Sequence, residues 1–183
     1  LGADVLLAVG GSLGARKIND SMLEYVKTAS GRKERVLWMT GEREFEKYSS
    51  AVKSFGKSSI VVVPFFRNMA DAYAAADLIV CRAGASTIAE IAARGIPSIL
   101  VPYPSATDDH QTENALVLAE AGAGMIIKDG DLSGERLSAE IDRLFADASR
   151  LEAMSRNAKK AAVPGAAGNV AAEIIRLAEA GNA

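Results

Sequence analysis

The residues from Val9 to Ala15, written VGGSLGA, form a glycine-rich turn close to the start of the chain. An apolar segment precedes the turn and a helical pattern follows it from about Arg16, which is the setting of many phosphate-binding turns. Free backbone N–H groups and the positive end of the helix dipole would face an anion there. Gly10, Gly11 and Gly14 permit backbone angles and close approaches that other residues resist, and Ser12 adds a hydroxyl donor. The turn therefore predicts a phosphate contact, with a ligand-free strand-to-helix turn as the alternative.

Two common nucleotide-binding patterns do not fit this turn. The letters GGSLGA differ from G-x-G-x-x-G, and no acidic residue clearly ends the second predicted strand to hold an adenine ribose. No Gly-Lys-Ser/Thr follows, so the turn is not a Walker A loop either. The pattern therefore disfavours NAD and the nucleotides of P-loop proteins.

A second glycine turn between a strand and a helix runs from Cys81 to Glu90, written CRAGASTIAE. Ala85, Ser86 and Thr87 stand at the predicted start of its helix. Two helix starts of this kind at neighbouring strand ends could together hold a diphosphate. Glu90 has two interpretations, because Thr87-x-x-Glu90 fits a capping box while an acidic side chain could also bind both hydroxyls of a ribose. The spacing alone favours the capping box.

A polar loop leads from the fifth apolar run into a helix between positions 102 and 115. Either aspartate of the Asp108-Asp109 pair fits the N-cap of that helix. Gln111 and Asn114 carry both donors and acceptors, which suits the hydroxyls of a sugar. His110 is the single histidine of the chain, and no nucleophile or carboxylate pair accompanies it at a fixed spacing. We therefore interpret it as a hydrogen-bonding or structural residue instead of a catalytic base.

The segment PFFRNMAD at positions 64–71 follows the third apolar run. Asn68 and Asp71 resemble a capping pair at the start of a helix. The consecutive aromatic residues Phe65 and Phe66 could also wall a pocket for a nucleobase, because flat rings stack well on aromatic and apolar side chains. Both interpretations stay open at this point.

Six short apolar runs alternate with amphipathic segments along the chain. The predicted strands lie at residues 5–9, 35–39, 59–63, 77–81, 98–102 and 124–128. Because these runs are continuously apolar, they fit strands of a parallel sheet that is buried on both faces. Helices are expected between them and at about 133–147, 149–162 and 167–181. The fold class is therefore a doubly wound, Rossmann-like α/β domain with six parallel strands, whose ligands bind beyond the carboxyl ends of the strands.

The composition is that of one globular domain of ordinary size. The chain has 183 residues, with 21 lysines and arginines against 23 aspartates and glutamates, so its net charge is −2. This balance gives no reason to expect nucleic acid as a partner. The single cysteine, Cys81, excludes an internal disulfide, and we assign it with Trp38 to the core. No cluster of residues has metal-ligand spacing, and the apolar runs are too short to span a bilayer.

Four motifs in a fixed order resemble the carboxyl-terminal half of the MurG family, the bacterial N-acetylglucosaminyltransferases that convert lipid I to lipid II in peptidoglycan synthesis. The motifs are GGSLGA followed by Asn19, PFFRNMADAYAAAD, CRAGASTIAEIAARGIPSILVPYP and ATDDHQTENA. The resemblance extends from Val5 into the final helices. It implies the GT-B fold, in which two Rossmann-like halves face each other across a cleft. The carboxyl-terminal half binds UDP-N-acetylglucosamine, while the amino-terminal half binds the lipid-linked acceptor, touches the membrane and supplies the catalytic base.

Carried over position by position, the resemblance assigns roles along the whole donor molecule. The residues that it places at the diphosphate are Gly11, Ser12, Gly14, Ala85, Ser86 and Thr87. The residues that it places at the other parts are Phe66 and Met69 for uracil, Glu90 for ribose, and Gln111 with His110 for N-acetylglucosamine. The resemblance thus favours ribose binding over the capping box for Glu90.

Two departures from the family pattern bear on these expectations. The amino-terminal half is not part of the chain, and neither is the segment before the first strand in which the family carries an arginine near the phosphates. We therefore expect residues 1–183 to be a single donor-binding domain that begins at a domain boundary and holds no catalytic residue. His110 stands where some relatives have glutamine.

The implied reaction is an inverting transfer, in which the C4 hydroxyl of the acceptor's N-acetylmuramoyl unit attacks the anomeric carbon and UDP leaves from the opposite face. Helix N-termini and hydroxyl or amide donors can stabilise the leaving diphosphate, so we expect no obligatory metal and no cofactor besides the substrate UDP-N-acetylglucosamine. The expected location is cytoplasmic, with the full-length enzyme at the cytoplasmic face of the bacterial inner membrane.

Two alternative functions use the same donor site. One is another GT-B enzyme that acts on a UDP-sugar, either a different transferase or an epimerase. The other is a non-catalytic donor-binding subunit that docks onto a separate membrane-anchored partner. The helix expected at 167–183 could pack on its own domain, which the sequence favours, or toward a missing amino-terminal domain.

Overall fold

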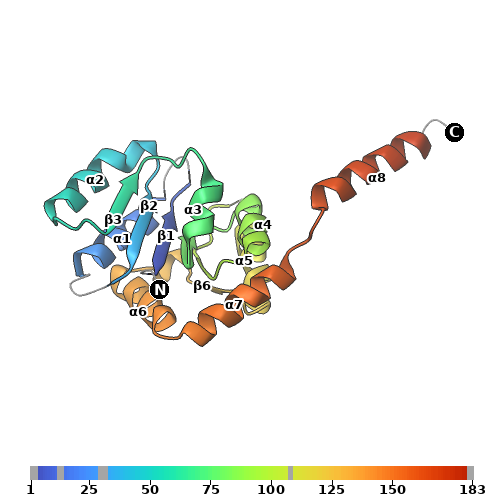
Figure 1. The fold of residues 1–183 in the computed structure, drawn as a ribbon. Coiled ribbons are helices and arrows are strands. Elements are labelled where there is room, and N and C mark those ends of the chain that lie inside the picture. The colour runs from blue at the N-terminus through green and yellow to red at the C-terminus, as the bar shows by residue number, and fades with distance from the viewer. Residues whose placement is uncertain (1–3, 12–14, 29–32, 107–108, 181–183) are drawn as a thin grey trace.

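A computed structural model describes residues 4–11, 15–28, 33–106 and 109–180 of the chain, and its central feature is a six-stranded parallel sheet (Figure 1). The strands are β1 (Val5–Val9), β2 (Arg35–Met39), β3 (Ile60–Val63), β4 (Leu78–Cys81), β5 (Ser98–Leu100) and β6 (Gly124–Ile126). Each predicted strand is present, and its ends differ from the prediction by at most two residues. β5 stops before Pro102, which has no backbone N–H to offer a neighbouring strand.

Helices connect the strands and continue beyond the last of them. Those between the strands are α1 (Arg16–Thr28), α2 (Phe45–Ser54), α3 (Met69–Ala75), α4 (Ala85–Arg94) and α5 (His110–Glu120). Those after the sheet are α6 (Gly134–Phe145), α7 (Ala148–Ala161) and α8 (Ala166–Ala180). Short 3-10 turns, η1 (Glu42–Glu44) and η3 (Asp129–Asp131), follow β2 and β6. The doubly wound α/β class predicted from the sequence is confirmed.

The strand order places the ligand edge of the sheet. The order is β3-β2-β1-β4-β5-β6, so the chain first moves outward from β1 to β3 and then returns to build β4 to β6 on the other side. The loops that follow β1 and β4 therefore diverge, which opens a crevice between them. The ends of these two strands are level, because Val9 pairs with Cys81.

The sheet separates two apolar cores. Along β1, Leu6 and Ala8 belong to one core and Leu7 and Val9 to the other, because successive side chains point to opposite faces. The first core includes side chains of α1, α2 and α6, and the second includes side chains of α3, α4 and α5. α7 takes part in both, through Met154 in the first and Ala158 in the second. Burial on both faces explains why the strands read as continuous apolar runs.

β3 is the outermost strand on one side of the sheet. It pairs with β2 through Ile60 to Val63 and stands at the end of the strand order. Its Val61 side chain is 47% exposed, whereas all four residues of β4 at the centre are buried. β3 is thus the least covered strand of its half of the sheet.

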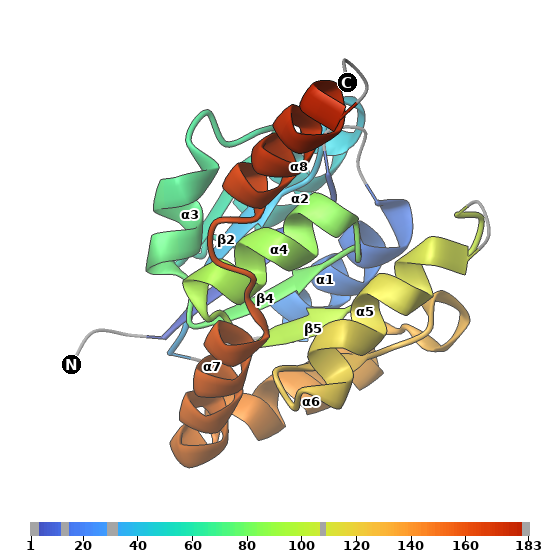
Figure 2. The same cartoon turned by 90° about the vertical axis from the view of Figure 1, so that its right-hand side faces the viewer.

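α8 projects away from the sheet domain (Figure 1), and it lies in front of the domain in the view turned by 90° (Figure 2). Residues 162–165 separate it from α7, and Gly165 has a positive φ of 74°. Ile174, Ile175 and Leu177 of this helix are 58–62% exposed. The sequence favours a terminal helix that packs on its own domain, and the structure shows no such packing for the side chains that it describes in α8. Over the described residues, no helix is both long and apolar enough to cross a bilayer.

Candidate functional site

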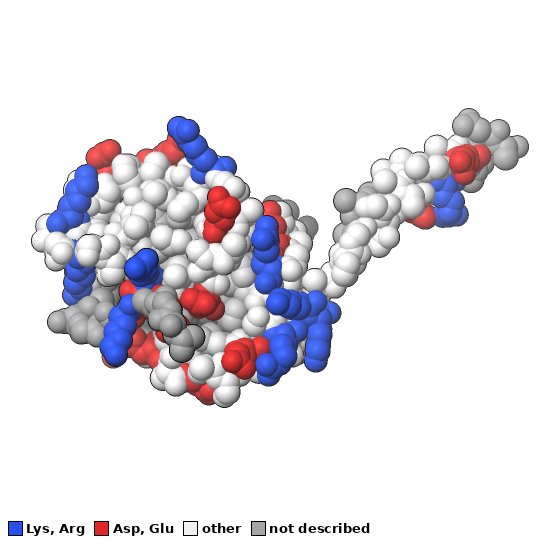
Figure 3. Space-filling model, in the orientation of Figure 1, with Lys and Arg blue, Asp and Glu red and all other residues white. Residues whose placement is uncertain are grey.

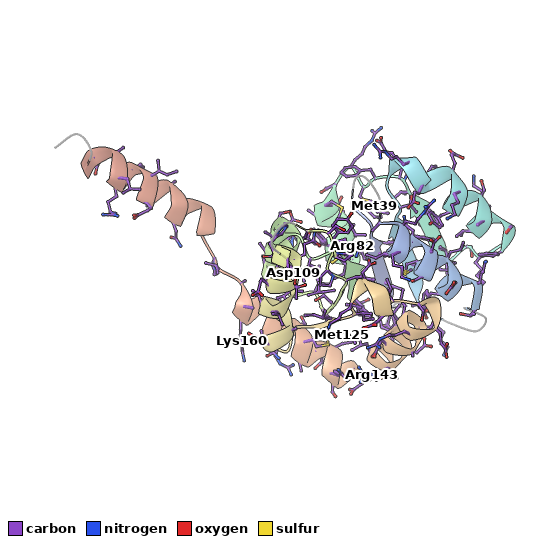
Figure 4. All side chains as sticks on the ribbon, turned by 180° about the vertical axis from the view of Figure 1, so that it is seen from behind. Met39, Arg82, Asp109, Met125, Arg143 and Lys160 are labelled. Carbon is purple, nitrogen blue, oxygen red and sulfur yellow. The ribbon has the colours of Figure 1, made fainter. Side chains whose placement is uncertain are left out.

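The loops at the carboxyl ends of β1, β4 and β5 surround a pocket of about 650 Å³. Its lining includes Arg16, Lys17, Asp20, Arg82, Tyr103 and Gln111. Three of its lining side chains are cationic, Arg16 and Lys17 in the first turn of α1 and Arg82 after β4, and two are acidic, Asp20 and Asp129. Figure 4 labels Met39, Arg82 and Asp109, which lie along this side of the domain, away from Arg143 and Lys160. A pocket with this lining at the switch point of the strand order suits an anionic ligand.

The first glycine turn lies tight against the sheet. The backbone nitrogen of Gly10 donates to the carbonyl oxygen of Met39 at 3.0 Å. A Cβ atom on Gly10 would lie 2.9 Å from the backbone nitrogen of Ala15, so only glycine fits this position. Gly11 is exposed and has a positive φ of 76°. Ser12 and Gly14, which the sequence analysis places at the diphosphate, lie outside the described residues.

Asn19 anchors the start of α1 to the end of β2. Its side chain is fully buried; Nδ2 donates to the carbonyl oxygen of Thr40 at 2.9 Å and to Oε2 of Glu44 at 2.8 Å. Its Oδ1 accepts a hydrogen bond from Nε1 of Trp38 at 3.0 Å. Trp38 is a core residue as predicted, and this bond also gives its indole N–H a partner. The network fixes α1 relative to the sheet directly beneath the glycine turn.

The second glycine turn presents a helix N-terminus without a side-chain cap. α4 begins at Ala85, and its N-cap residue is Gly84, which makes no side-chain hydrogen bond. Ala85 and Ser86 are exposed and Thr87 is half-buried. The backbone N–H groups of the first helical turn have no partner within the helix and are available to an anion.

The capping box that the spacing favours for Thr87 and Glu90 is wrong. Thr87 is the third residue of α4 and not its N-cap, so Glu90 lies too far along the helix to close a box. Glu90 is exposed, and its Oε2 instead accepts a hydrogen bond from the hydroxyl group of Tyr73 at 2.8 Å. The carboxylate of Glu90 therefore does not cap α4.

Gln111 and Asn114 on α5 hold the loop that precedes α4. Oε1 of Gln111 accepts from the backbone nitrogens of Ala83 at 3.2 Å and Tyr103 at 3.0 Å. Nδ2 of Asn114 donates to the carbonyl oxygen of Ala83 at 3.0 Å. Both amides suit the hydroxyls of a sugar by residue type, but these bonds commit the Asn114 nitrogen and the Gln111 oxygen to the backbone. Within the described residues, Nε2 of Gln111 makes no hydrogen bond to the protein and remains a donor for a ligand.

Asp109 and His110 form the start of α5. Asp109 occupies the predicted N-cap position with φ of 53°, but its carboxylate accepts from Oγ1 of Thr112 at 2.7 Å and does not cap the backbone. His110 is exposed and is the first residue of the helix. Asp108 lies outside the described residues. His110 thus stands one residue from Gln111, on the turn that faces the pocket.

The segment after β3 contains the helix cap that its sequence indicates. Oδ1 of Asn68 accepts from the backbone nitrogen of Ala70 at 3.1 Å, and Nδ2 of Asn68 donates to Oδ2 of Asp71 at 2.8 Å. The predicted capping pair is therefore confirmed. Phe66 and Met69 are half-buried against the second core, whereas Phe65 is 48% exposed. The cap does not involve the rings, so it leaves the proposed base wall intact.

Comparisons with known proteins identify the family. Residues 5–170 match the model of the glycosyltransferase family 28 C-terminal domain. The chain belongs to this family. The match covers all six strands and the helices up to the beginning of α8.

Individual family 28 relatives and solved structures agree with this assignment. The chain is 44% identical over 176 residues, which is 95% of its length, to the UDP-N-acetylglucosamine--N-acetylmuramyl-(pentapeptide) pyrophosphoryl-undecaprenol N-acetylglucosamine transferase of Chlorobium phaeobacteroides. The crystal structure of MurG from Acinetobacter baumannii superposes with a TM-score of 0.86 at 34% identity, over 95% of this chain and 52% of that one. A putative UDP-N-acetylglucosamine 2-epimerase from Listeria monocytogenes shares the fold, with a TM-score of 0.70 at 17% identity over 97% and 46% of the two chains. The chain spans about half the length of the curated relatives it matches.

One feature of the family 28 domain was not singled out from the sequence. Nη1 of Arg82 donates to the carbonyl oxygens of Val101 and Pro102, both at 3.1 Å, and lies 2.6 Å from Oδ1 of Asp129. The guanidinium group also lies 5.3 Å from the ring centre of Tyr103. Arg82 therefore ties together the ends of β4, β5 and β6 at the pocket. The position of Arg82 directly after β4 indicates that it lies at the ligand edge of the sheet. Its pairing with Asp129 could not be predicted, because Asp129 is 47 residues away and shares no local pattern with Arg82.

The remaining charges are spread over the surface. Figure 3 shows acidic and basic side chains interspersed on the face that it presents, with lysines and arginines gathered where α7 passes into α8. Lys159 and Lys160 are the basic residues of the last turn of α7. Among the described residues, no group of three or more histidine, cysteine, aspartate or glutamate side chains is arranged to hold a metal ion.

Proposed function

We propose that this chain is the donor-binding half of an inverting N-acetylglucosaminyltransferase that converts lipid I to lipid II in peptidoglycan synthesis. Membership of family 28 supports this assignment, as does the activity named for a relative that is 44% identical over 95% of the chain. The observation that carries the proposal is the pocket at the switch point, which the start of α1, Arg82 after β4 and Gln111 of α5 line.

The donor would lie across the carboxyl edge of the sheet. Its diphosphate would meet Gly11 and the residues Ser12 and Gly14 on one side, and the uncapped first turn of α4 on the other. That turn contains Ala85, Ser86 and Thr87. Backbone N–H groups at both helix starts, together with nearby cations, would compensate the negative charge of the diphosphate.

The other parts of the donor would follow from this position. Uracil would lie against Phe66 and Met69, and the ribose hydroxyls would bind the carboxylate of Glu90. The hydroxyls of N-acetylglucosamine would contact Gln111 and His110. Because Oε1 of Gln111 already accepts two backbone hydrogen bonds, its contribution to the sugar is the pair of donors on Nε2.

This half would act on the leaving group. The C4 hydroxyl oxygen of the acceptor forms a bond to the anomeric carbon while the bond from that carbon to the UDP oxygen breaks. Negative charge then grows on the diphosphate, where donors that are already in place stabilise it without reorganisation. A base from the amino-terminal half would take the hydroxyl proton, so this chain supplies binding and charge stabilisation without a catalytic residue.

The acceptor, the membrane and the catalytic base would all be contacted through the amino-terminal half, with the whole enzyme at the cytoplasmic face of the inner membrane. α8 would pack toward that half, because Ile174, Ile175 and Leu177 give it an apolar surface that the sheet domain does not cover. An exposed apolar helix face of this kind gains stability when a partner surface buries it.

Calorimetric titration of this chain tests the assignment. UDP-N-acetylglucosamine should bind more tightly than UDP, UDP-glucose or UDP-galactose, and its affinity should not depend on added magnesium. Equal affinity for all three UDP-sugars would contradict the donor assignment. A requirement for magnesium would contradict the proposed mode of diphosphate binding.

A second measurement separates the competing functions. Incubation of the chain alone with a lipid I analogue and UDP-N-acetylglucosamine should give no product, and addition of the amino-terminal half of a relative should restore transfer. Product from this chain alone would overturn the assignment of the base to the other half. Inversion at C2 of the sugar, observed by proton NMR, would instead identify an epimerase.

A further inference from the structure

Tyr73 and Glu90 form a hydrogen-bonded pair that bridges two helices at the edge of the proposed nucleoside site. The hydroxyl group of Tyr73 on α3 donates to Oε2 of Glu90 on α4 at 2.8 Å. Tyr73 is only 6% exposed and packs in the second core, whereas Glu90 is exposed. A rigid, buried side chain thus holds one oxygen of a flexible, solvent-facing one.

The direction of this hydrogen bond is fixed by the surroundings of Tyr73. Burial raises the pKa of its hydroxyl group, and the hydrogen bond to Glu90 raises it further. The phenol therefore keeps its proton at neutral pH and acts as the donor, while the carboxylate acts as the acceptor. Oε1 and the remaining lone pairs of Glu90 stay available for other donors.

Two adjacent hydroxyl groups are the ligand that such a carboxylate fits best. A vicinal diol can donate two hydrogen bonds to one carboxylate, provided that the carboxylate plane is correctly oriented. An unsupported glutamate on a helix surface samples several rotamers and must lose that freedom on binding. The bond from Tyr73 removes part of this cost before the ligand arrives.

The same helix also bears a residue of the proposed base wall. Met69 and Tyr73 are four residues apart on α3, so they share one face of that helix. Met69 packs against the second core, to which Tyr73 belongs. Base and ribose would therefore be positioned by a single element whose start is fixed by the Asn68 cap.

We infer that Tyr73 is a positioning residue that orients Glu90 for the 2′ and 3′ hydroxyls of a uridine nucleotide. This inference rests on the proposed donor-binding function. It goes beyond that function because it assigns a role in ribose recognition to a tyrosine on α3, a different helix from the one that bears Glu90.

The test compares UDP with 2′,3′-dideoxy-UDP by calorimetry on the full chain and its variants. Tyr73→Phe keeps the ring and its packing but removes the donor, so it should weaken UDP binding about fivefold and leave 2′,3′-dideoxy-UDP unchanged. Glu90→Gln should reduce the preference for UDP by a larger factor. The double variant should bind UDP as Glu90→Gln does, because the tyrosine acts only through the glutamate.

Tyr25→Phe is the matched control. Tyr25 is also buried and also donates to a carboxylate, that of Glu34, at the opposite end of the sheet. This variant should leave both affinities unchanged, and the melting temperatures of the two phenylalanine variants show whether either change acts through stability.

Three outcomes would overturn the inference. If Tyr73→Phe binds UDP as the unaltered chain does, while Glu90→Gln loses the preference, the ribose site stands and the role of Tyr73 fails. If Tyr73→Phe weakens UDP and 2′,3′-dideoxy-UDP equally, the tyrosine is merely structural. If neither variant changes the preference for UDP, the ribose site itself is wrong, and the proposed function loses that part of its support.

Discussion

The side-chain oxygen of Gln111 accepts a hydrogen bond from the backbone nitrogen of Ala83, 28 residues earlier in the chain, at 3.2 Å. The neighbouring Asn114 donates to the carbonyl oxygen of the same residue. Both polar backbone groups of Ala83 are thus held by amide side chains of α5. Gln111 uses its amide oxygen and Asn114 its amide nitrogen, so replacing each amide by the corresponding carboxylate should have a different effect at the two positions.

Gln111→Glu should change ligand selectivity and not stability. The new carboxylate keeps an oxygen for the N–H groups of Ala83 and Tyr103, but it loses the two donors of Nε2. The preference for UDP-N-acetylglucosamine over UDP should fall about tenfold, as expected for lost hydrogen bonds to sugar hydroxyls. Calorimetry with both ligands measures this. An unchanged preference would remove Gln111 from the sugar site.

Asn114→Asp should change stability and not sugar selectivity. The substitution places a carboxylate oxygen against the carbonyl oxygen of Ala83, where Nδ2 now donates. The free energy of unfolding should fall by about 1–3 kcal/mol, because the buried carbonyl oxygen loses its donor and its partial negative charge faces a carboxylate. Urea denaturation gives this value, and a variant as stable as the parent would show that the bond contributes little.

Gly10→Ala should destabilise the chain, whereas Gly84→Ala should not. A Cβ on Gly10 would lie 2.9 Å from the backbone nitrogen of Ala15, and a backbone group cannot move aside as a side chain can. A Cβ on Gly84 has Oγ1 of Thr87 at 3.8 Å as its nearest contact. We expect losses of about 1–3 kcal/mol for the first change and less than about 1 kcal/mol for the second, both measured by urea denaturation. Equal losses would contradict the close approach of the first turn.

Cys81 should resist thiol reagents in the folded chain. Burial raises the pKa of its thiol group to about 12, and its side chain is 1% exposed, so at pH 8 the thiol is protonated as well as inaccessible. Reaction with an aromatic disulfide reagent should be slow in buffer and rapid in 6 M guanidinium (about the concentration that unfolds most domains). Rapid reaction in buffer would indicate that the centre of the sheet opens frequently.

The contacts of Asp20 should make stability depend on pH at the acid end. Burial raises the pKa of its carboxyl group, but hydrogen bonds from Lys47 and Tyr48 outweigh this effect, so the pKa lies below the usual 3.8. A lowered pKa means that the carboxylate stabilises the fold above that value, and the stabilisation disappears as the pH falls through the folded-state pKa. Asp20→Asn should therefore be less stable than the parent at pH 7 and equally stable near pH 2. A difference that persists in acid would assign the effect to packing.

The sequence predicts the sheet and the ligand edge well because both depend on local patterns. Continuous apolar runs identify β1 and β2 residue for residue, and the glycine turns mark the strand ends that meet at the pocket. The predicted Asn68 cap is also local, and it is present. Each of these features is encoded within a few consecutive residues.

The pairs that complete the site are not local, and the sequence does not reveal them. Tyr73 reaches Glu90 across 17 positions, and Arg82 reaches Asp129 across 47. The capping box at Thr87 fails for the same reason, because α4 begins at Ala85, two residues before Thr87, once Ala83 is held from α5. Tertiary contacts here decide where a helix starts and which partner a carboxylate takes.

β3 closes one side of the sheet with a strand of four β-branched residues, and its outer N–H and C=O groups face away from β2. Val61 adds an exposed apolar side chain to that border. An open, apolar border of this kind is a template on which a second chain can add a strand. The isolated chain should consequently self-associate through β3 when it is concentrated. Ligand-binding measurements should therefore be made at protein concentrations below those at which it self-associates.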